Sequence, residues 1–273
     1  MLNCKNCNTN FEGKYCTNCG QKFYTDHDKS LKHFLEEIFH FLTHFEGSFF
    51  TSLSTIYTKP GKLTEDYTGG IRKKYYKPIS LYLLLIVLYL IFPLAHGLNV
   101  ALKYHKDNSF YGNYAEKRIE QKIAKLQISD EEFTEHFEQK SAKVSKILLL
   151  LFIPYSALLI YLLCFYKKPY VFDLTILATE INVFYLSFVF ILFPGLLLLF
   201  NKLTGTYLIT DEVIFTLIPG IIFMLFCGLS FRRFFNQNWL ISLVSGLVFA
   251  ALHFLFMVFI YRLIVFQATM FLL

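Results

Sequence analysis

Hydrophobic residues occur along the chain in five long runs that are separated by polar segments. The runs lie at about 79–100, 147–166, 174–198, 213–231 and 239–261. Each run approaches or exceeds the roughly 20 residues that a helix needs to cross a 30 Å hydrocarbon layer. The pattern therefore predicts an all-α fold, a polytopic transmembrane helix bundle of about five spans.

A shorter amphipathic pattern precedes the first run, between residues 29 and 45. At 100° per residue, its apolar side chains share one broad face, and His33, Glu37, His40 and His44 fall on the opposite face. The spacing Glu37-x-x-His40 also occurs in metal sites of helix bundles, but those sites project inward. We therefore interpret this His/Glu stripe as a solvated surface on a helix that lies along the inner membrane interface, with a metal site as the alternative.

The segment 101–146, between the first two runs, carries nine Lys or Arg and eight Asp or Glu residues. Apolar side chains recur at helical spacing in it, and Ser129-Asp-Glu-Glu132 is a capping-box sequence. We expect a hairpin of two helices flanking 127–130, on the outer side of the membrane. The predicted organisation is a Cys-rich module at 1–24, an interfacial helical region at 25–78 and a membrane domain at 79–273.

Composition and charge support this interpretation and indicate an orientation. The 273 residues are 55% hydrophobic and only 17% charged, whereas about a quarter are charged in soluble domains. The net charge of +6 arises largely from basic residues at 62–77, Lys167-Lys168 and Arg232-Arg233. Basic connections remain on the cytoplasmic side, which predicts a cytoplasmic-membrane protein with its amino terminus inside and its carboxyl terminus outside. We expect no nucleic-acid partner.

Four of the six cysteines form two C-x-x-C pairs near the amino terminus, Cys4/Cys7 and Cys16/Cys19. A turn-forming residue follows each pair, Asn8 in one and Gly20 in the other. Four thiolates at this spacing suit tetrahedral Zn²⁺ with no open position, and metal binding supplies folding energy that a module of about 20 residues lacks. We predict a structural zinc ribbon; a redox C-x-x-C is the alternative interpretation.

Glu180 is the carboxylate predicted deepest in the membrane. It lies about 10 Å beyond the cytoplasmic start of the third run, and Asp173 lies seven residues earlier on the same face. An intramembrane carboxylate is either a functional group or a buried group that is hydrogen-bonded within the bundle, and both interpretations stay open. Asn182 projects roughly 200° away from Glu180, so the two side chains should serve different surroundings.

His253 is the second polar candidate within a span. Ser242, Gly246 and Ala250 form a small-residue stripe that favours close approach of another helix, and His253 falls almost on that stripe. We expect it to face protein and to find a polar partner on a neighbouring span, as a packing residue or a proton-transfer group. Arg262, near the outer end of the fifth span, is interpreted as an interfacial anchor.

The residues quoted next carry a resemblance to a known family. They are Cys4-Lys-Asn-Cys7, Cys16-Thr-Asn-Cys19-Gly-Gln, the block from Pro60-Gly61-Lys62 to Arg72-Lys-Lys-Tyr75, and Phe231-Arg-Arg-Phe-Phe-Asn-Gln-Asn-Trp239. The chain resembles a bacterial membrane-protein family, common in Bacteroidetes, that is defined only as a domain of unknown function with an amino-terminal zinc ribbon. The resemblance implies a bacterial inner-membrane protein and no particular activity.

Two hypotheses for the function follow from these features. The first is a membrane-anchored interaction or regulatory module whose ribbon binds a protein partner. The second is a transporter of a small solute, an ion or a lipid that uses Glu180 and His253, and prolines at 93, 154, 194 and 219 would kink its helices. The sequence has no phosphate-binding loop, H-E-x-x-H or G-x-S-x-G motif, so we expect no enzyme.

Overall fold

The computed structural model describes residues 2–4, 6–13, 15–20, 47–91, 101–167, 169–205 and 212–273. Its contacts divide the chain into two compact units, Met1–Phe50 and Thr51–Leu273. The predicted amphipathic helix at 29–45, with the stripe of His33, Glu37, His40 and His44, lies outside the described residues. That helix and the choice between a solvated stripe and a metal site therefore stay predictions.

In the first unit, a two-stranded antiparallel sheet organises the cysteines. Strand β1 (Leu2–Asn3) pairs with β2 (Asn10–Phe11), so that Leu2 lies opposite Phe11. Phe11 is buried together with Cys4 and Cys16, and Leu2 and Cys7 pack against them. This core is small, as expected for a module that depends on metal ligation for stability.

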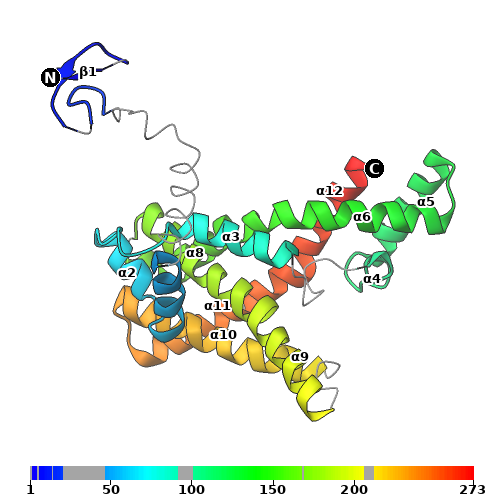
Figure 1. The fold of residues 1–273 in the computed structure, drawn as a ribbon. Helices are drawn as coiled ribbons and strands as arrows, with labels where there is room; N and C mark the ends of the chain where they lie inside the picture. The colour runs from blue at the N-terminus through cyan, green and yellow to red at the C-terminus, as the bar shows by residue number, and fades with distance from the viewer. Residues whose placement is uncertain are drawn as a thin grey trace. The chain divides into compact units, whose positions relative to one another are not determined.

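The second unit is helical, and Figure 1 shows its course. A helix covering 47–58 leads into short helix α2 (Lys62–Thr68). The following helices are α3 (Pro78–Ile91), α4 (Leu102–Lys106), α5 (Gly112–Leu126), α6 (Asp130–Leu148), α7 (Phe152–Cys164), α8 (Val171–Ser187), α9 (Phe193–Thr204), α10 (Glu212–Phe235), α11 (Trp239–Leu255) and α12 (Arg262–Leu272). Short 3-10 segments, η2 (Leu149–Leu151) and η3 (Phe165–Lys167), adjoin α7, and π-helical segments, η4 (Phe188–Leu192) and η6 (Phe256–Tyr261), join α8 to α9 and α11 to α12.

Four helices in the described part of the chain are long and apolar enough to cross a membrane. They are Asp130–Lys167, Val171–Thr204, Thr216–Phe235 and Trp239–Leu272. They confirm a polytopic helical membrane protein and coincide with the last four predicted spans. The first predicted span, 79–100, is described as a helix over Pro78–Ile91, and its remaining residues lie outside the described ranges.

Two of these helices are longer than the hydrophobic runs suggested. The second helix of the predicted outer hairpin and the second span form one helix of 38 residues, and the last span extends to Leu272. The sequence pattern divided each of them because a change from polar to apolar surroundings alters composition without ending a helix. The helix start predicted at the capping-box sequence is confirmed, since Ser129 is the N-cap and its side chain accepts a hydrogen bond from the backbone N–H of Glu132.

The predicted small-residue stripe is the contact between α10 and α11. A Cβ atom on Gly246 would lie 2.6 Å from the backbone nitrogen of Gly228 and 2.9 Å from the carbonyl oxygen of Met224. Only glycine permits the two backbones to approach this closely, which is the packing mode expected of small residues in membrane helices.

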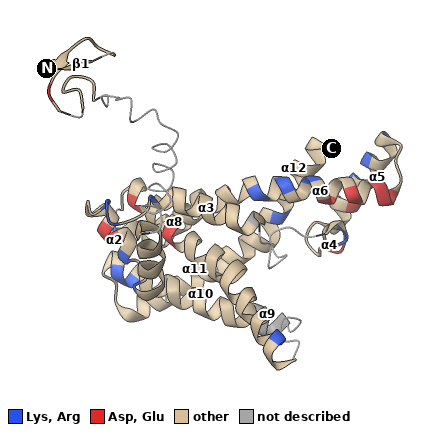
Figure 2. Cartoon of the chain, in the orientation of Figure 1, with Lys and Arg blue, Asp and Glu red and all other residues tan. Residues whose placement is uncertain are grey.

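The three basic connections lie at the same end of the helical unit. A guanidinium nitrogen of Arg233 donates to the carbonyl oxygen of Pro60 at 2.6 Å, and Gln237 donates to the hydroxyl of Tyr166, also at 2.6 Å. Arg72 lies over the ring of Phe172 at 5.3 Å. Figure 2 shows basic residues gathered around α2 and the end of α10. A shared end is what the positive-inside rule requires of these segments.

At the opposite end, helices α4, α5, α6 and α12 enclose a separate apolar core. Its buried members are Leu102, Tyr111, Ala115, Ile119, Phe133, Phe137, Phe266 and Met270. His105 is 1% exposed, and its ring lies 5.7 Å from that of Phe137 and 5.2 Å from that of Phe266. Its Nδ1 is hydrogen-bonded to the Tyr111 hydroxyl at 2.8 Å. Burial, with the nearby positive charge of Arg262, lowers the pKa of His105 to about 4.

Acid should therefore destabilise this apolar core through His105. Because the pKa of His105 is lower in the folded chain than the value of about 6.5 for an exposed imidazole, protonation favours the unfolded state as pH falls below 6.5. Between pH 7 and pH 4.5 this effect amounts to about 2 kcal/mol. We expect His105→Phe to become progressively more stable than wild type over that range, as measured by thermal unfolding. A stability difference that does not change with pH would contradict this assignment.

Candidate functional site

The four amino-terminal cysteines lie in two similar turns. The backbone N–H of Asn8 donates to the carbonyl of Cys4, and that of Gly20 donates to the carbonyl of Cys16. Asn8 and Gly20 both have a positive φ, 56° and 73°, a conformation that Asn and Gly adopt with the least strain. The prediction that these residues close the two turns is confirmed.

The geometry of the cluster fits a tetrahedral metal ion. The Sγ atoms of Cys4 and Cys19 are 3.5 Å apart and those of Cys7 and Cys16 are 3.6 Å apart, and all four ligand atoms lie within 4.8 Å of one another. Four Zn–S bonds of about 2.3 Å in a tetrahedron place the sulfurs roughly 3.8 Å apart. The four cysteines can therefore hold a metal ion with no position left for a substrate.

Glu180, on α8, is 1% exposed, and its carboxylate is hydrogen-bonded to the segment before and within α2. One oxygen accepts from the backbone N–H of Gly61 at 2.8 Å. The other accepts from the backbone N–H of Thr64 at 2.8 Å and from the Thr64 hydroxyl at 2.5 Å. The first N–H groups of a helix have no partner within the helix, so Glu180 supplies the cap that α2 lacks locally. Of the two interpretations of Glu180, the described contacts correspond to the hydrogen-bonded one.

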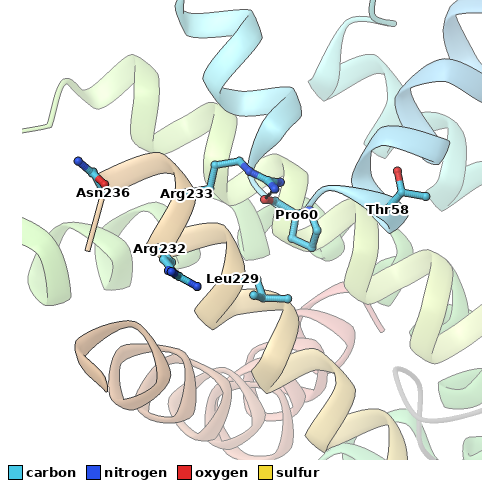
Figure 3. A pocket seen from close by; sticks show the side chains of 6 residues that line it. All are labelled: Thr58, Pro60, Leu229, Arg232, Arg233 and Asn236. Carbon is cyan, nitrogen blue, oxygen red and sulfur yellow. Dashed lines mark hydrogen bonds between the residues drawn. The ribbon is translucent and has the colours of Figure 1, made fainter. Parts of the chain in front are cut away.

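The loop that Glu180 holds also contacts α10. Gly61 has φ 77°, and a Cβ atom there would lie 2.8 Å from the carbonyl oxygen of Ser230, so neither the conformation nor the space suits another residue. Arg233 donates to the carbonyl of Pro60 at 2.6 Å. Figure 3 shows the side chain of Arg233 reaching Pro60 at a surface pocket of about 400 Å³. We call Pro60, Gly61 and Thr64, with Glu180 and Arg233, the loop clamp.

Asp66 holds the other end of α2 in place. The Tyr75 hydroxyl donates to Oδ2 of Asp66 at 2.6 Å, and the ammonium groups of Lys62 and Lys74 lie 3.0 and 3.6 Å from its carboxylate oxygens. Burial raises the pKa of Asp66, but the Tyr75 hydrogen bond and the two lysines outweigh burial and hold this pKa below its usual value. The segment between helix 47–58 and α3 is therefore fixed by polar contacts at both ends of α2.

The other polar candidates on α8 have separate surroundings. Asp173 lies half-buried in the first turn of α8 and is not among the groups hydrogen-bonded to Glu180. The amide nitrogen of Asn182 donates to Ser156 Oγ at 2.9 Å and to the carbonyl of Ala178 at 2.7 Å. Asn182 thus faces α7 whereas Glu180 faces α2, as their angular separation predicted.

His253 is fully buried in α11 and faces protein, as predicted. Five aromatic rings surround its imidazole at centroid distances of 4.7 to 6.2 Å, those of Phe152, Tyr155, Tyr185, Phe223 and Phe249. Neither ring nitrogen has a hydrogen-bond partner among the described residues. The expected polar partner on a neighbouring span is therefore not found among the described residues.

Sequence reasoning identified Glu180 but missed its hydrogen-bond partners Gly61 and Thr64, and it missed the contact of Arg233 with Pro60. Glu180 is separated from Gly61 by 119 residues and from Thr64 by 116 residues, and helical periodicity carries no information about such distant contacts. One local signal was available, since Pro60-Gly61 directly precedes Lys62 and a glycine at a helix start often marks a close approach of another backbone.

A comparison with known families finds a match that includes this segment. Residues 46–90 match the model of a family described as "Protein of unknown function (DUF3667)". The match includes Gly61, Thr64 and Asp66 and ends within α3, so it covers the half of the loop clamp that precedes the membrane spans. No curated protein and no solved structure matches the chain.

Metal analysis of the purified chain should show one zinc ion per molecule, because four thiolates complete the tetrahedral shell. We expect Cys16→Ala to abolish stoichiometric zinc, as measured by inductively coupled plasma mass spectrometry. Cys227→Ala is the matched control, since Cys227 is also a buried free cysteine but lies in α10. Equal zinc contents in the two variants would refute the site.

Removal of the Glu180 carboxylate should loosen the loop clamp. Glu180→Ala leaves two backbone N–H groups and a hydroxyl without their acceptor, and each buried unsatisfied group costs about 1–3 kcal/mol. We expect a loss of about 3 kcal/mol in chemical unfolding in micelles, and faster tryptic cleavage after Lys59 and Lys62. Asp173→Asn should cost less than about 1 kcal/mol. Cleavage at wild-type rates in Glu180→Ala would show that Glu180 does not hold the loop.

Proposed function

We propose that this protein is a non-enzymatic membrane-anchored interaction module, in which a zinc ribbon on the cytoplasmic side binds a protein partner. The observation that carries the proposal is the closed four-cysteine cluster in a compact unit of its own. A metal site with four protein ligands stabilises a fold and leaves no position for substrate. A small fold of this kind, joined to a helical membrane unit, suits recognition rather than catalysis.

The proposed location is the cytoplasmic membrane, with the amino terminus in the cytoplasm. Support comes from the three basic connections, which share one end of the helical unit. Residues 60–64 lie at this same end, where Glu180 bonds to Gly61 and Thr64 and Arg233 bonds to Pro60. A partner bound to the ribbon would thus be tethered to a fixed point of the membrane unit.

The alternative, a transporter that uses Glu180 and His253 together, has less support. The Glu180 carboxylate is occupied by three hydrogen bonds with Gly61 and Thr64. His253 lies among aromatic rings that include those of Tyr185 and Phe223. A relay between the two side chains would require the loop clamp to open first.

The interaction proposal can be tested by proximity labelling in cells that express the full chain. A labelling enzyme fused to the amino terminus should mark a defined set of cytoplasmic proteins, and we expect Cys4→Ala/Cys16→Ala to lose most of that set. Cys164→Ala/Cys227→Ala, which alters the same number of buried cysteines outside the ribbon, should retain it. An unchanged set in the ribbon variant would eliminate the ribbon as a docking site.

A further inference from the structure

A cavity of about 510 Å³ lies between α8, α10 and α11, in the membrane-spanning part of the chain. Val189 and Phe190 line it from one side, Pro219 and Gly220 from another, and Met257 and Val258 from a third. Its volume falls within the range of roughly 300–1,000 Å³ that is typical of small-molecule sites. The cavity is distinct from the loop clamp, since it contains neither Glu180 nor Gly61.

Each of the three helices that form the cavity has an irregular stretch, and that stretch lines the cavity. Val189 and Phe190 belong to the π-helical segment η4, and Met257 and Val258 belong to the π-helical segment η6. Pro219 lies inside α10, where it removes a backbone hydrogen bond. π-Helical turns are rare and occur frequently at functional sites, and interrupted helices line many binding sites within membranes. Three such interruptions around one cavity point to a site rather than a packing defect.

His253 supplies a second and independent observation. It lines the cavity and is 0% exposed, and neither of its ring nitrogens has a hydrogen-bond partner among the described residues. An imidazole carries one donor and one acceptor when it is neutral, and buried polar groups are normally paired. A ligand with an oxygen or hydroxyl group near this ring would supply the hydrogen-bond partner that the described protein groups do not provide.

Arg262 determines the charge that such a ligand should carry. It lines the cavity from the first turn of α12, and helical side chains lean toward the amino terminus of their helix, here toward η6 and the cavity. A guanidinium group presents several donors in a plane that matches carboxylate and phosphate oxygens. Among the described residues that line the cavity, Arg262 is the only Lys, Arg, Asp or Glu.

The remaining lining indicates how the ligand enters and what its body is like. Apolar side chains such as Phe190, Phe223 and Met257 dominate the wall. Gly220 and Phe254 also line the cavity while being exposed on the outer surface of the helices. A helix surface of this kind faces lipid in a membrane protein, so the cavity is accessible from the bilayer.

We propose that this cavity binds a single-chain anionic amphiphile, with its carboxylate or phosphate head at Arg262 and His253 and its hydrocarbon chain against the apolar wall. The oxyanion accepts hydrogen bonds from the guanidinium and from one imidazole nitrogen. The head comes either from a free fatty acid or from a phospholipid that inserts one chain, and both present the same chemistry to the cavity.

The test uses the full chain in phosphatidylcholine nanodiscs, with bound ligands counted by native mass spectrometry. Laurate is the fatty-acid probe, phosphatidylglycerol the phospholipid probe, and dodecanol the same chain without an oxyanion. We expect saturable retention of one laurate or one phosphatidylglycerol per chain and at least tenfold weaker retention of dodecanol. When both anionic probes are present, the probe that displaces the other shows whether the head comes from a fatty acid or from a phospholipid. Equal retention of dodecanol and laurate would overturn the proposal.

Two variants and one control locate the ligand. Gly220→Leu should weaken retention at least tenfold by obstructing the cavity, because Gly220 lines it and a Cβ atom there meets nothing within 4 Å, so that the larger side chain fits without disturbing the fold. Arg262→Gln should weaken laurate binding at least tenfold, whereas Arg118→Gln, an exposed cation on α5, should leave it unchanged. Wild-type retention by Gly220→Leu or by Arg262→Gln would refute the site.

His253→Phe separates a binding role from a packing role. Phenylalanine suits the aromatic surroundings and removes two unpaired nitrogens, so the melting temperature without added probe should rise. If His253 contacts the anionic head of the ligand, the same variant should bind laurate about threefold to tenfold more weakly. A higher melting temperature with unchanged laurate binding would show that His253 is only a packing residue and would overturn its part in the site.

Discussion

The need to satisfy one carboxylate inside a membrane-spanning helix governs the basic end of this protein. Glu180 projects from α8, where a charge without partners would be costly, and it finds its partners on the segment that precedes the first predicted span. Hydrogen bonds of 2.8 Å hold that segment against α8. The segment also lies so close to α10 that a Cβ atom at position 61 would be 2.8 Å from the carbonyl oxygen of Ser230, which requires glycine there. Arg233 then adds a positive charge and a hydrogen bond to Pro60. A polar requirement within the membrane thereby fixes the path of a chain segment outside the spans.

Local patterns predicted the features that depend on neighbours in sequence. The C-x-x-C pairs, the turn residues Asn8 and Gly20, the capping box at Ser129 and the Gly246 stripe are each encoded within about ten residues, and the structure agrees with each. The pairing of Glu180 with Gly61 and Thr64 was not predictable, because hydropathy marks a carboxylate as unusual without identifying its partner. The π-helical segments were missed for a related reason, since one extra residue in a turn hardly changes the period of a uniformly apolar run.

Helix lengths show a second limit of hydropathy. The runs at 147–166 and 239–261 mark the lipid-exposed portions well, but the helices continue to Asp130 in one case and Leu272 in the other. Beyond the apolar runs, amphipathic packing against α4 and α5 maintains the helices, as the buried rings of Phe137 and Phe266 show. A change in solvent therefore occurs in the middle of a helix, and a boundary drawn from composition reports the membrane surface rather than the end of the element.

Helix α8 connects the two polar features of the membrane unit. It carries Glu180 at the loop clamp and ends at Ser187, whose hydroxyl is hydrogen-bonded to that of Tyr57 in the helix before the clamp, at 2.7 Å. The next residue begins η4, the π-helical wall of the cavity. The Tyr57–Ser187 contact, three residues before Pro60, therefore lies directly beside the start of η4. The loop clamp and the proposed amphiphile site therefore share helix α8, although Glu180 and His253 themselves have no described contact in common.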